Sequence, residues 1–339
     1  SYTGDKLQIN VGGQSVLLLS GETAQISGSD ANQLTISIPD YAVPGETGLT
    51  FTDVKMTTPL FNVFEGTSSN ASRDITLSGE LRDGRLTLNL TPTYKSDIIG
   101  VWNLNLETDD FGTATLTPIS IETEQDISGS QFIVQILGAL LKGSMAVVNI
   151  DFQADGNLTA TYNSNLLNDM MPALSGEQIS PVFVHSPLNA IKWYVKDGAL
   201  YLVPNLNLML KNDPSKAQLG PLDPGTITTV GIPLYFKKEG DKMTVYVSKE
   251  QTAPVFGLLS TVISMIDPSF ELSLGGSSLP LRSLLEALVK PLIDAALAAE
   301  RFDLCLNLVA GAIPEEAPQP SEEASAAAVK RLEAFIAQQ

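Results

Sequence analysis

Alternating apolar and polar residues form the dominant pattern of this chain, and the pattern is clearest between residues 99 and 162. The stretch opens with an alternating run at 99–104 and closes with a second run at 148–159, in which Asp155-Gly156 fits a tight hairpin turn. A period of two is typical of a strand with one buried face. Between the two runs, residues 132–141 carry apolar side chains at helical spacing. We therefore predict the first strands of a β-barrel with a helix inserted early.

Residues 2–94 show the same alternation in shorter runs that are separated by polar turns. Apolar residues alternate in 7–11, 34–38 and 75–90, and Gly12-Gly13 and Asp83-Gly84 supply hairpin turn signals. This pattern favours an all-β sandwich or a small barrel. Proline is disfavoured in a central strand, so Pro92 is interpreted as the start of a domain boundary. The first predicted domain is therefore all-β and covers residues 1–96.

The second predicted domain, residues 97–313, combines further alternating runs with helical stripes. Hairpins are predicted at 191–202 and 230–247, and apolar residues recur at helical spacing in 255–266 and 284–297. A last alternating run at 302–308 is placed to close the barrel. The domain is predicted as a larger β-barrel with inserted helices.

Residues 314–339 form a tail of different composition. An acidic, proline-rich linker at 314–320 precedes a helix predicted at 321–337, which has Val329, Leu332 and Ile336 on one narrow face. Because an isolated helix of this length is marginal in water, it either docks or frays. We predict docking on the protein itself or on a second copy.

Charge and composition exclude several classes of function. The formal net charge of the 339 residues is -18, which argues against binding to nucleic acid or to anionic lipid. The chain has one cysteine and one histidine, so an internal disulfide and a multi-histidine zinc site are excluded. No apolar run is long enough to span a membrane. Ser1 is not a natural start, and we expect that an upstream segment, most commonly a signal peptide, has been removed.

Three groups of residues are candidates for chemistry, and each has a plain structural alternative. His185 is predicted in a proline-bounded loop, where it could act in acid-base catalysis or serve a structural role. Cys305 lies on an alternating strand, where a buried and unreactive thiol is the alternative to a nucleophile. Residues 98–141 contain no Lys or Arg, and the acidic residues of this stretch could bind calcium or form a solvated rim. They are Glu107, Asp109, Asp110, Glu122, Glu124 and Asp126. We assign no catalytic residue and no metal ligand from these groups.

Trp102 and Trp193 are the candidate ligand-binding residues. Each occupies an apolar position near the start of a predicted barrel strand. A barrel of about eight strands has room inside for side chains or for one small ligand. The two tryptophans could therefore line a pocket, or they could be part of the core.

Several of these motifs resemble the calycin-like and lipocalin-like β-barrel domains of secreted Bacteroidetes lipoproteins of an uncharacterised family. The calycin-like resemblance rests on Tyr2-Thr3-Gly4 with Leu7, Ile9 and Val11, on Leu34-Thr35-Ile36-Ser37-Ile38, and on Leu77-Ser78-Gly79-Glu80-Leu81 with Asp83-Gly84-Arg85-Leu86-Thr87-Leu88. The lipocalin-like resemblance rests on Ile99-Gly100-Val101-Trp102, the inserted helix, and Ile150-Asp151-Phe152 with Asp155-Gly156 and Leu158-Thr159. The two resemblances cover most of residues 2–310.

This resemblance implies an exported protein of the cell envelope, on the periplasmic or cell-surface side of the outer membrane. Its lipid anchor would lie upstream of Ser1, and the family supplies no catalytic residues to transfer. We expect a non-enzymatic binding or assembly module without a cofactor, whose partner is an apolar or glycan ligand or an envelope protein. The alternative is a hydrolase of envelope or dietary polymers, which would need two carboxylates in one cleft.

Overall fold

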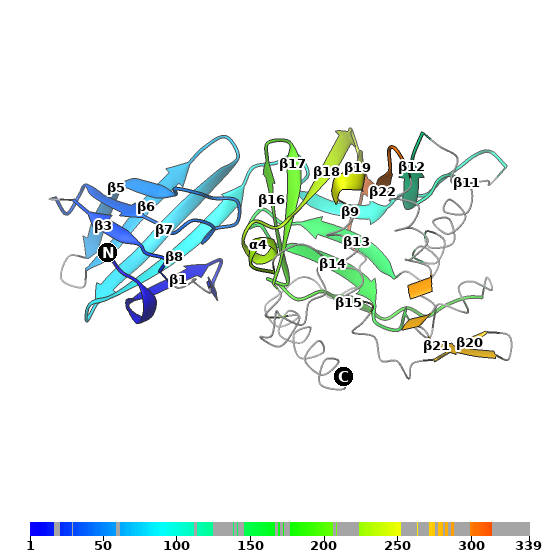
Figure 1. The fold of residues 1–339 in the computed structure, drawn as a ribbon, viewed down its shortest axis with the longest axis horizontal. Helices are drawn as coiled ribbons and strands as arrows, with labels where there is room; N and C mark the ends of the chain where they lie inside the picture. The colour runs from blue at the N-terminus through cyan, green and yellow to red at the C-terminus, as the bar shows by residue number, and fades with distance from the viewer. Residues whose placement is uncertain are drawn as a thin grey trace. The chain divides into compact units, whose positions relative to one another are not determined.

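The computed structural model describes a mainly β protein that divides into two compact units. The described ranges, apart from a few single residues, are 1–16, 21–28, 30–58, 62–111, 114–124, 146–166, 177–205, 224–251, 271–274, 277–280 and 299–313. One unit comprises Ser1–Ile99, Gln153–Asn157 and Lys192–Lys196, and the other comprises the remaining residues. Both sheets are strongly curled (Figure 1), which confirms the predicted mainly β fold of the β-barrel class.

The first unit is built on an eight-stranded sheet with the order β2-β1-β8-β7-β6-β5-β4-β3. Its strands are β1 Leu7–Val11, β2 Gln14–Ser15, β3 Gln25–Ser27, β4 Leu34–Ser37, β5 Thr50–Thr58, β6 Val63–Ser69, β7 Arg73–Arg82 and β8 Arg85–Tyr94. All neighbours are antiparallel except β1 and β8, which are parallel. A short 3-10 helix, η1 Gly4–Lys6, precedes β1.

The long β7–β8 hairpin follows directly from the sequence pattern. Asp83 and Gly84 adopt φ values of 52° and 74°, as a tight hairpin turn requires. The alternation then turns every second residue of each strand inward, including Ile75 and Leu77 on β7 and Leu88 on β8. Burial of one such side chain stabilises the fold by roughly 1.5–3 kcal/mol. The first-unit core therefore lies on one face of this hairpin.

Phe64 shows how the neighbouring strand β6 joins that core. It pairs with Gly79 of β7, and a Cβ atom at Gly79 would lie only 2.4 Å from the Phe64 ring. The missing side chain thus leaves space for the ring to fold across the strand. Phe64 is 2% exposed as a result.

The first sheet is also bridged near its two ends. Tyr2, which precedes β1, and Ala24, which precedes β3, exchange backbone hydrogen bonds of 2.8 and 3.0 Å. This bridge connects segments beside the two outer parts of the sheet and leaves fewer unpaired groups at its edges. The sheet is therefore curled far enough for its ends to meet.

The predicted interruption of strand pairing at Pro92 is wrong, because β8 continues through Pro92 to Tyr94. The main segment of the first compact unit ends at Ile99. Pro92 pairs with Ile75 of β7. On the other side of β8, the pairing with β1 ends at Leu90. Since strand β1 does not reach Pro92, the proline occupies an edge position, where its missing N–H group is tolerated.

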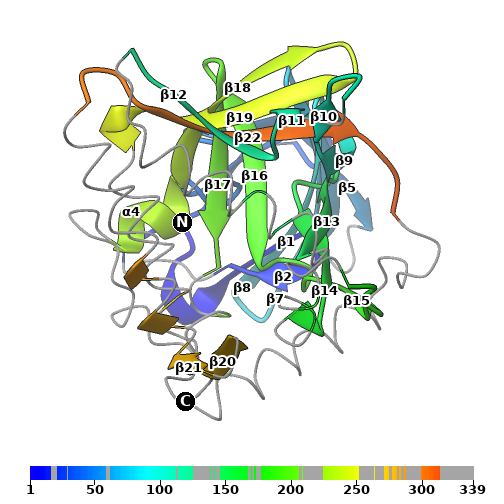
Figure 2. The ribbon, with the colours of Figure 1, turned by 90° about the vertical axis from the view of Figure 1, so that its right-hand side faces the viewer.

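The second unit contributes most of a ten-stranded sheet with the order β15-β14-β13-β9-β22-β19-β18-β17-β16, in which β12 also pairs with β22. Its strands are β9 Gly100–Leu104, β12 Ile119–Glu122, β13 Val147–Phe152, β14 Leu158–Asn163, β15 Phe183–His185, β16 Ile191–Lys196, β17 Ala199–Pro204, β18 Ile232–Glu239, β19 Lys242–Val247 and β22 Asp303–Ala310. In Figure 2, β18, β19 and β22 run across the view whereas β16 and β17 run down it, which makes the curl of this sheet visible.

Smaller elements accompany this sheet. They are the two-stranded pairs β10 Glu107–Thr108 with β11 Ala114–Leu116 and β20 Glu271–Leu274 with β21 Ser277–Pro280, the helix α4 Pro224–Thr229 and the 3-10 helix η4 Lys249–Gln251.

The predicted hairpins and the closing strand of this region are present. The hairpins are β13–β14, β16–β17 and β18–β19, and β22 lies between β9 and β19, so it joins the first strand of the sheet to a late one. The helices predicted at 132–141, 255–266 and 284–297 and the tail at 314–339 lie outside the described residues, apart from isolated positions. Those predictions stay open.

Candidate functional site

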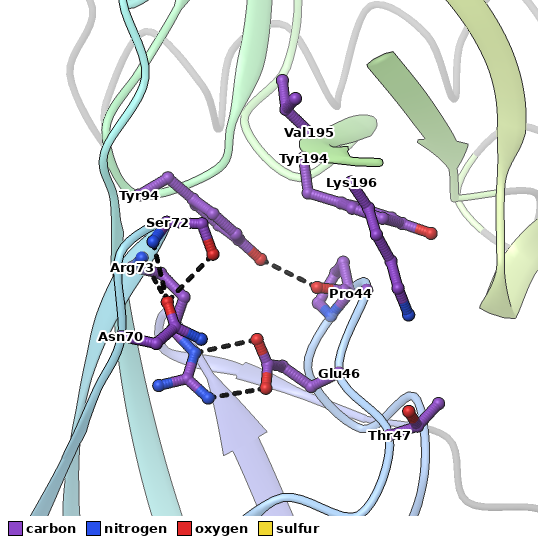
Figure 3. A pocket seen from close by; sticks show the side chains of 11 residues that line it. Pro44, Glu46, Thr47, Asn70, Ser72, Arg73, Tyr94, Tyr194, Val195 and Lys196 are labelled. Atoms are coloured by element: carbon purple, nitrogen blue, oxygen red, sulfur yellow. Dashed lines mark hydrogen bonds and ion pairs between the residues drawn. The ribbon is translucent and has the colours of Figure 1, made fainter. Parts of the chain in front are cut away.

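The first unit contains a polar hollow with a volume of about 220 Å³, shown in Figure 3. Four segments line it: the loop 44–47, the turn between β6 and β7 together with the first residue of β7, the end of β8, and the end of β16. All of its lining residues belong to the first compact unit. The hollow is partly open to solvent and has a buried floor and an exposed rim.

The loop that carries the first lining segment is fixed by its own hydrogen bonds. The Tyr41 amide donates to the Glu46 carbonyl at 2.8 Å, and the Gly48 amide donates to Asp40 Oδ1 at 2.6 Å. Between these bonds, Ala42 and Val43 are buried in the core. The loop is thus anchored from inside and presents its outer residues in a set position.

Gly45 brings this loop against the ring of Tyr194. Its φ of 81° lies in the left-handed region that favours glycine. A Cβ atom at Gly45 would lie 2.5 Å from Cδ2 of Tyr194, closer than carbon atoms can pack. The close approach therefore depends on glycine at this position.

The floor of the hollow contains a bidentate ion pair between Arg73 and Glu46. Arg73 Nε donates to Glu46 Oε1 at 2.8 Å, and Arg73 Nη2 donates to Glu46 Oε2 at 2.6 Å. Arg73 Nη1 donates to both the carbonyl and the hydroxyl oxygen of Ser68, at 3.0 and 3.1 Å. The hydrogen bonds to Glu46 raise the pKa of Arg73, and burial opposes this effect. Four of the five N–H groups of this guanidinium are therefore engaged by the protein.

Arg73 is buried because of its place in the alternation of β7. It points to the same face as Ile75 and Leu77, and it is 6% exposed. A buried cation needs a partner, since loss of one member of a buried ion pair costs about 3–5 kcal/mol. Glu46 supplies that partner, so the pair fixes the loop to the first residue of β7.

Asn70 organises the turn that forms the second wall. Its Oδ1 atom accepts hydrogen bonds from the Ser72 amide, the Ser72 hydroxyl and the Arg73 amide, at 2.8, 2.9 and 2.8 Å. Its amide NH2 group makes no hydrogen bond with any residue in the described ranges. This side chain can therefore hold the turn and still offer two donor hydrogens to a ligand.

Tyr94 closes the inner end of the hollow. Its hydroxyl donates to the Pro44 carbonyl at 3.0 Å, and its ring centroid lies 5.7 Å from that of Trp193. Burial raises the pKa of Tyr94 well above its ordinary value of 10.0. The hydroxyl therefore keeps its proton and acts as a hydrogen-bonded wall.

The rim carries polar groups that are not committed to the protein. Thr47 and Lys196 are both exposed. Within the part of the chain that the structure describes, the ammonium of Lys196 makes no ion pair. Lys196 and Tyr194 are two residues apart on β16 and so lie on one face of that strand, and Figure 3 shows both bordering the hollow. Asn70, Thr47 and Lys196 thus supply donors to the same lining that contains the Glu46 carboxylate.

The two predicted ligand-binding residues occupy buried positions in different units. Trp193 lies on β16 in the first unit, is fully buried, and donates its indole N–H to the Gln153 and Asn157 carbonyls at 3.0 and 3.1 Å. Trp102 lies on β9 in the second unit and is 4% exposed. Neither lines the hollow. A ligand-binding role for either residue stays a prediction.

His185 lies on a strand, so its predicted position in a loop is wrong. It is the last residue of β15, which pairs with β14. Its Nδ1 atom lies 3.3 Å from the Thr161 hydroxyl, and the residue is 3% exposed. The pairing with β14 overrides the local proline signal and makes this histidine part of the interior.

Two of the acidic residues considered for calcium binding, Glu107 and Glu122, form separate ion pairs. Glu107 pairs with Lys242, whose hydrogen bond holds the pKa of Glu107 below its ordinary value. Glu122 pairs with Arg301 at 3.5 Å. Asp126 lies outside the described residues. Among the residues that are described, no group of three or more His, Cys, Asp or Glu side chains is arranged to hold a metal ion.

Cys305 is buried on β22. It is 2% exposed, and its Sγ atom lies 3.8 Å from the Asp303 carbonyl. Burial raises the pKa of the thiol to about 12. A thiol that stays protonated and inaccessible is a poor nucleophile.

The structure thus defines a mainly β protein of the β-barrel class with a small polar hollow in its first unit. Comparisons with protein-family models, with curated proteins and with solved structures found no match. No helix in the described ranges is both long and apolar enough to cross a membrane.

None of the polar residues of this hollow was predicted as a site residue from the sequence. One available signal was Arg73, which stands at an inward position of the alternating series 73, 75, 77. Tyr94 similarly ends the inward series that begins at Leu86. A charged residue in a buried register needs a partner, but the pattern does not show that Glu46 is that partner.

Proposed function

We propose that the protein is a non-enzymatic binding protein whose first unit binds one sugar residue of a glycan in the polar hollow. The observation that carries this proposal is that uncommitted donors on the rim line the same hollow as the fixed carboxylate of Glu46. Sugar hydroxyl groups both donate and accept hydrogen bonds, so they match a wall that offers both kinds of partner.

The lining favours a glycan over the apolar ligand that was the other expectation. Asn70, Thr47 and Lys196 would lose hydrogen bonds to water against an apolar molecule, and each loss is unfavourable. A hydroxylated ligand replaces those bonds. The walls formed by Tyr94 and Tyr194 supply the apolar surface that sugar C–H groups can contact.

The size of the hollow limits what it can hold. At about 220 Å³ it is smaller than the ~300–1,000 Å³ pockets that bind drug-sized ligands. A single sugar ring at the end or side of a longer glycan matches this volume, with the remainder of the glycan in solvent.

The hydrolase hypothesis finds no support in this hollow. Glycoside hydrolysis uses two carboxyl groups about 5–10 Å apart. Glu46 is the one carboxylate among the residues that line the hollow, and it is engaged by Arg73. The site therefore favours binding without bond cleavage.

We also propose that the protein acts in the cell envelope as an exported lipoprotein, anchored through a lipid on a cysteine upstream of Ser1. The support is the resemblance of the two regions to calycin-like and lipocalin-like domains. A glycan ligand is consistent with such a location. Fractionation and intact-mass measurement of the protein expressed with its native upstream segment would test this placement.

Titration calorimetry with a panel of sugars tests the binding site. Asn70→Asp keeps the oxygen that holds the turn and removes the NH2 donors, and Thr47→Val removes a rim hydroxyl. Each change should weaken binding about two- to tenfold, the range for one hydrogen bond.

The matched control is Asn89→Asp. Asn89 is an exposed residue of β8 whose Oδ1 accepts a hydrogen bond from Asn10 at 2.8 Å, and it does not line the hollow. This variant should bind like the parent. If no sugar binds at millimolar concentration, or if the two rim variants bind as tightly as the control, the proposal is wrong.

A further inference from the structure

The charges around the hollow leave one cation without a counter-ion. Arg73 and Glu46 neutralise each other through two hydrogen bonds. Just outside the lining, Lys95 and Asp74 pair at 2.7 Å. Among the residues that line the hollow, this leaves Lys196 as the uncompensated charge.

This local excess of positive charge is opposite in sign to the net charge of the chain. The formal net charge of the protein is -18, so the surface as a whole repels anions. The hollow places the ammonium of Lys196 beside a cavity whose lining carries a net charge of about +1 at neutral pH, counted with ordinary ionisation of its side chains. An anionic group is therefore favoured here although it is disfavoured over most of the surface.

The two cations of the lining have different roles. Arg73 is fixed, since three of its nitrogen atoms already donate to Glu46 and Ser68. Lys196 lies at the rim and is exposed, so its three N–H donors are available. A lysine binds an anion as a point charge and does not require a planar partner. Lys196 can thus contact a carboxylate at the edge of a ligand while the ring occupies the hollow.

From this arrangement we infer that the ligand is an acidic sugar, whose carboxylate binds Lys196 and whose hydroxyl groups bind Asn70, Thr47 and Glu46. This inference rests on the proposed function, because it specifies the ligand class for the same hollow. Glu46 does not repel such a ligand strongly, since its charge is compensated by Arg73 at 2.6 Å.

The test compares matched sugars that differ only in the acidic group. Titration calorimetry at low salt would use D-glucuronate against D-glucose and D-galacturonate against D-galactose. In at least one pair the acid should bind about fivefold more tightly than the neutral sugar, the upper range for an exposed ion pair. The preference should shrink as salt is added, because the charge of Lys196 is open to screening.

Two variants assign this preference to Lys196. Lys196→Gln should remove it, and Lys196→Glu should reverse it in favour of the cationic sugar D-glucosamine. Lys55→Gln is the matched control, because Lys55 is an exposed lysine of the same unit that does not line the hollow. Circular dichroism of each variant checks that the fold is retained.

The outcomes separate this inference from the proposed function. If neutral and acidic sugars bind equally well, or if Lys196→Gln keeps the preference, the inference is wrong and the sugar site remains. If neither member of any pair binds, the proposed function fails and the inference fails with it.

Discussion

At the scale of single residues, Arg73 shows that an alternating pattern can place a charged side chain in the interior. Arg73 begins the inward series of β7 and lies in the interior as a cation. Its burial is tolerated because Glu46 and Ser68 accept its hydrogen bonds. The same residue that completes the register of a strand therefore also builds the floor of the hollow.

Cys305 gives a residue-scale prediction about pH. Its pKa is raised from an ordinary value of 9.0 to about 12 by burial. Between these two values the unfolded chain loses the thiol proton and the folded chain keeps it. The stabilising contribution is complete below pH 9 and is lost as pH rises toward 12, at about 1.4 kcal/mol per pH unit.

Cys305→Ala removes this contribution. The free energy of unfolding of the variant should therefore fall less steeply than that of the parent between about pH 9 and 11. Urea denaturation at a series of pH values measures both slopes. Thr47→Val, which leaves the thiol unchanged, should keep the slope of the parent. Equal slopes for Cys305→Ala and the parent would contradict the assignment.

At the scale of elements, the loop 39–48 does most to shape the hollow. Its inner residues Ala42 and Val43 are in the core, and its outer residues Gly45, Glu46 and Thr47 line the site. Because its inner residues pack in the first-unit core, the loop holds the Glu46 carboxylate in a fixed position.

A pair of glycine substitutions in this loop separates close packing from backbone strain. Gly45 and Gly48 have φ values of 81° and 64°, so alanine is strained at both positions by roughly 1–2 kcal/mol. Only at Gly45 does the added methyl group meet another atom, the Tyr194 ring. Gly45→Ala should therefore destabilise the protein by about 2 kcal/mol more than Gly48→Ala.

Chemical denaturation of the two variants measures the difference between their free energies of unfolding. The comparison requires that the free energy of unfolding falls with denaturant concentration at the same slope in both variants. Gly45→Ala should also weaken sugar binding, because the loop must move away from Tyr194. Equal stability of the two variants would show that the loop does not depend on its contact with the ring.

The elements that the sequence predicted well are those whose signals are local. Alternation together with Asp83-Gly84 and Asp155-Gly156 located two hairpins, and alternation over 191–202 located a third, because turn chemistry and strand period act within a few residues. Strand β6 was missed, since Glu65, Gly66 and Thr67 interrupt its apolar alternation and only its pairing with β5 and β7 makes it a strand.

The candidate site could not be predicted for a related reason. Glu46 and Arg73 are 27 residues apart, and Lys196 is far from both in the chain. Their meeting depends on long-range pairing and on an irregular loop, which have no periodic signature. The prediction at Pro92 was wrong for a different reason. Proline is a local signal for the end of strand pairing, but Pro92 lies beyond the end of β1 and is tolerated in β8 as an edge residue.

At the scale of the whole molecule, the first unit has its own core. The buried apolar cluster of this unit lies entirely within residues 7–90. The hollow, in contrast, also needs Tyr194, Val195 and Lys196, which enter the unit from a distant part of the chain. The first unit should therefore fold without residues 194–196, whereas the hollow should bind a ligand only when they are present.

This difference predicts the behaviour of a fragment that ends at Ile99. The fragment should fold, because its core is complete, but it should not bind the sugar that the full chain binds. Amide dispersion in NMR spectra and titration calorimetry measure the two properties. Collapsed dispersion would contradict a self-contained core, and binding with parental affinity would show that β16 is not needed for the site.

The most direct measurement is an amide-resolved NMR titration of the full chain with the acidic and neutral sugars. The account predicts saturable shifts concentrated at Glu46, Thr47, Asn70, Ser72 and Lys196. The shifts should be larger at a given concentration for the preferred acid than for its neutral counterpart. Saturable shifts located only elsewhere in the chain, or no shifts at concentrations up to tens of millimolar, well above the usual range for specific binding, would contradict the assignment of this hollow as a sugar-binding site.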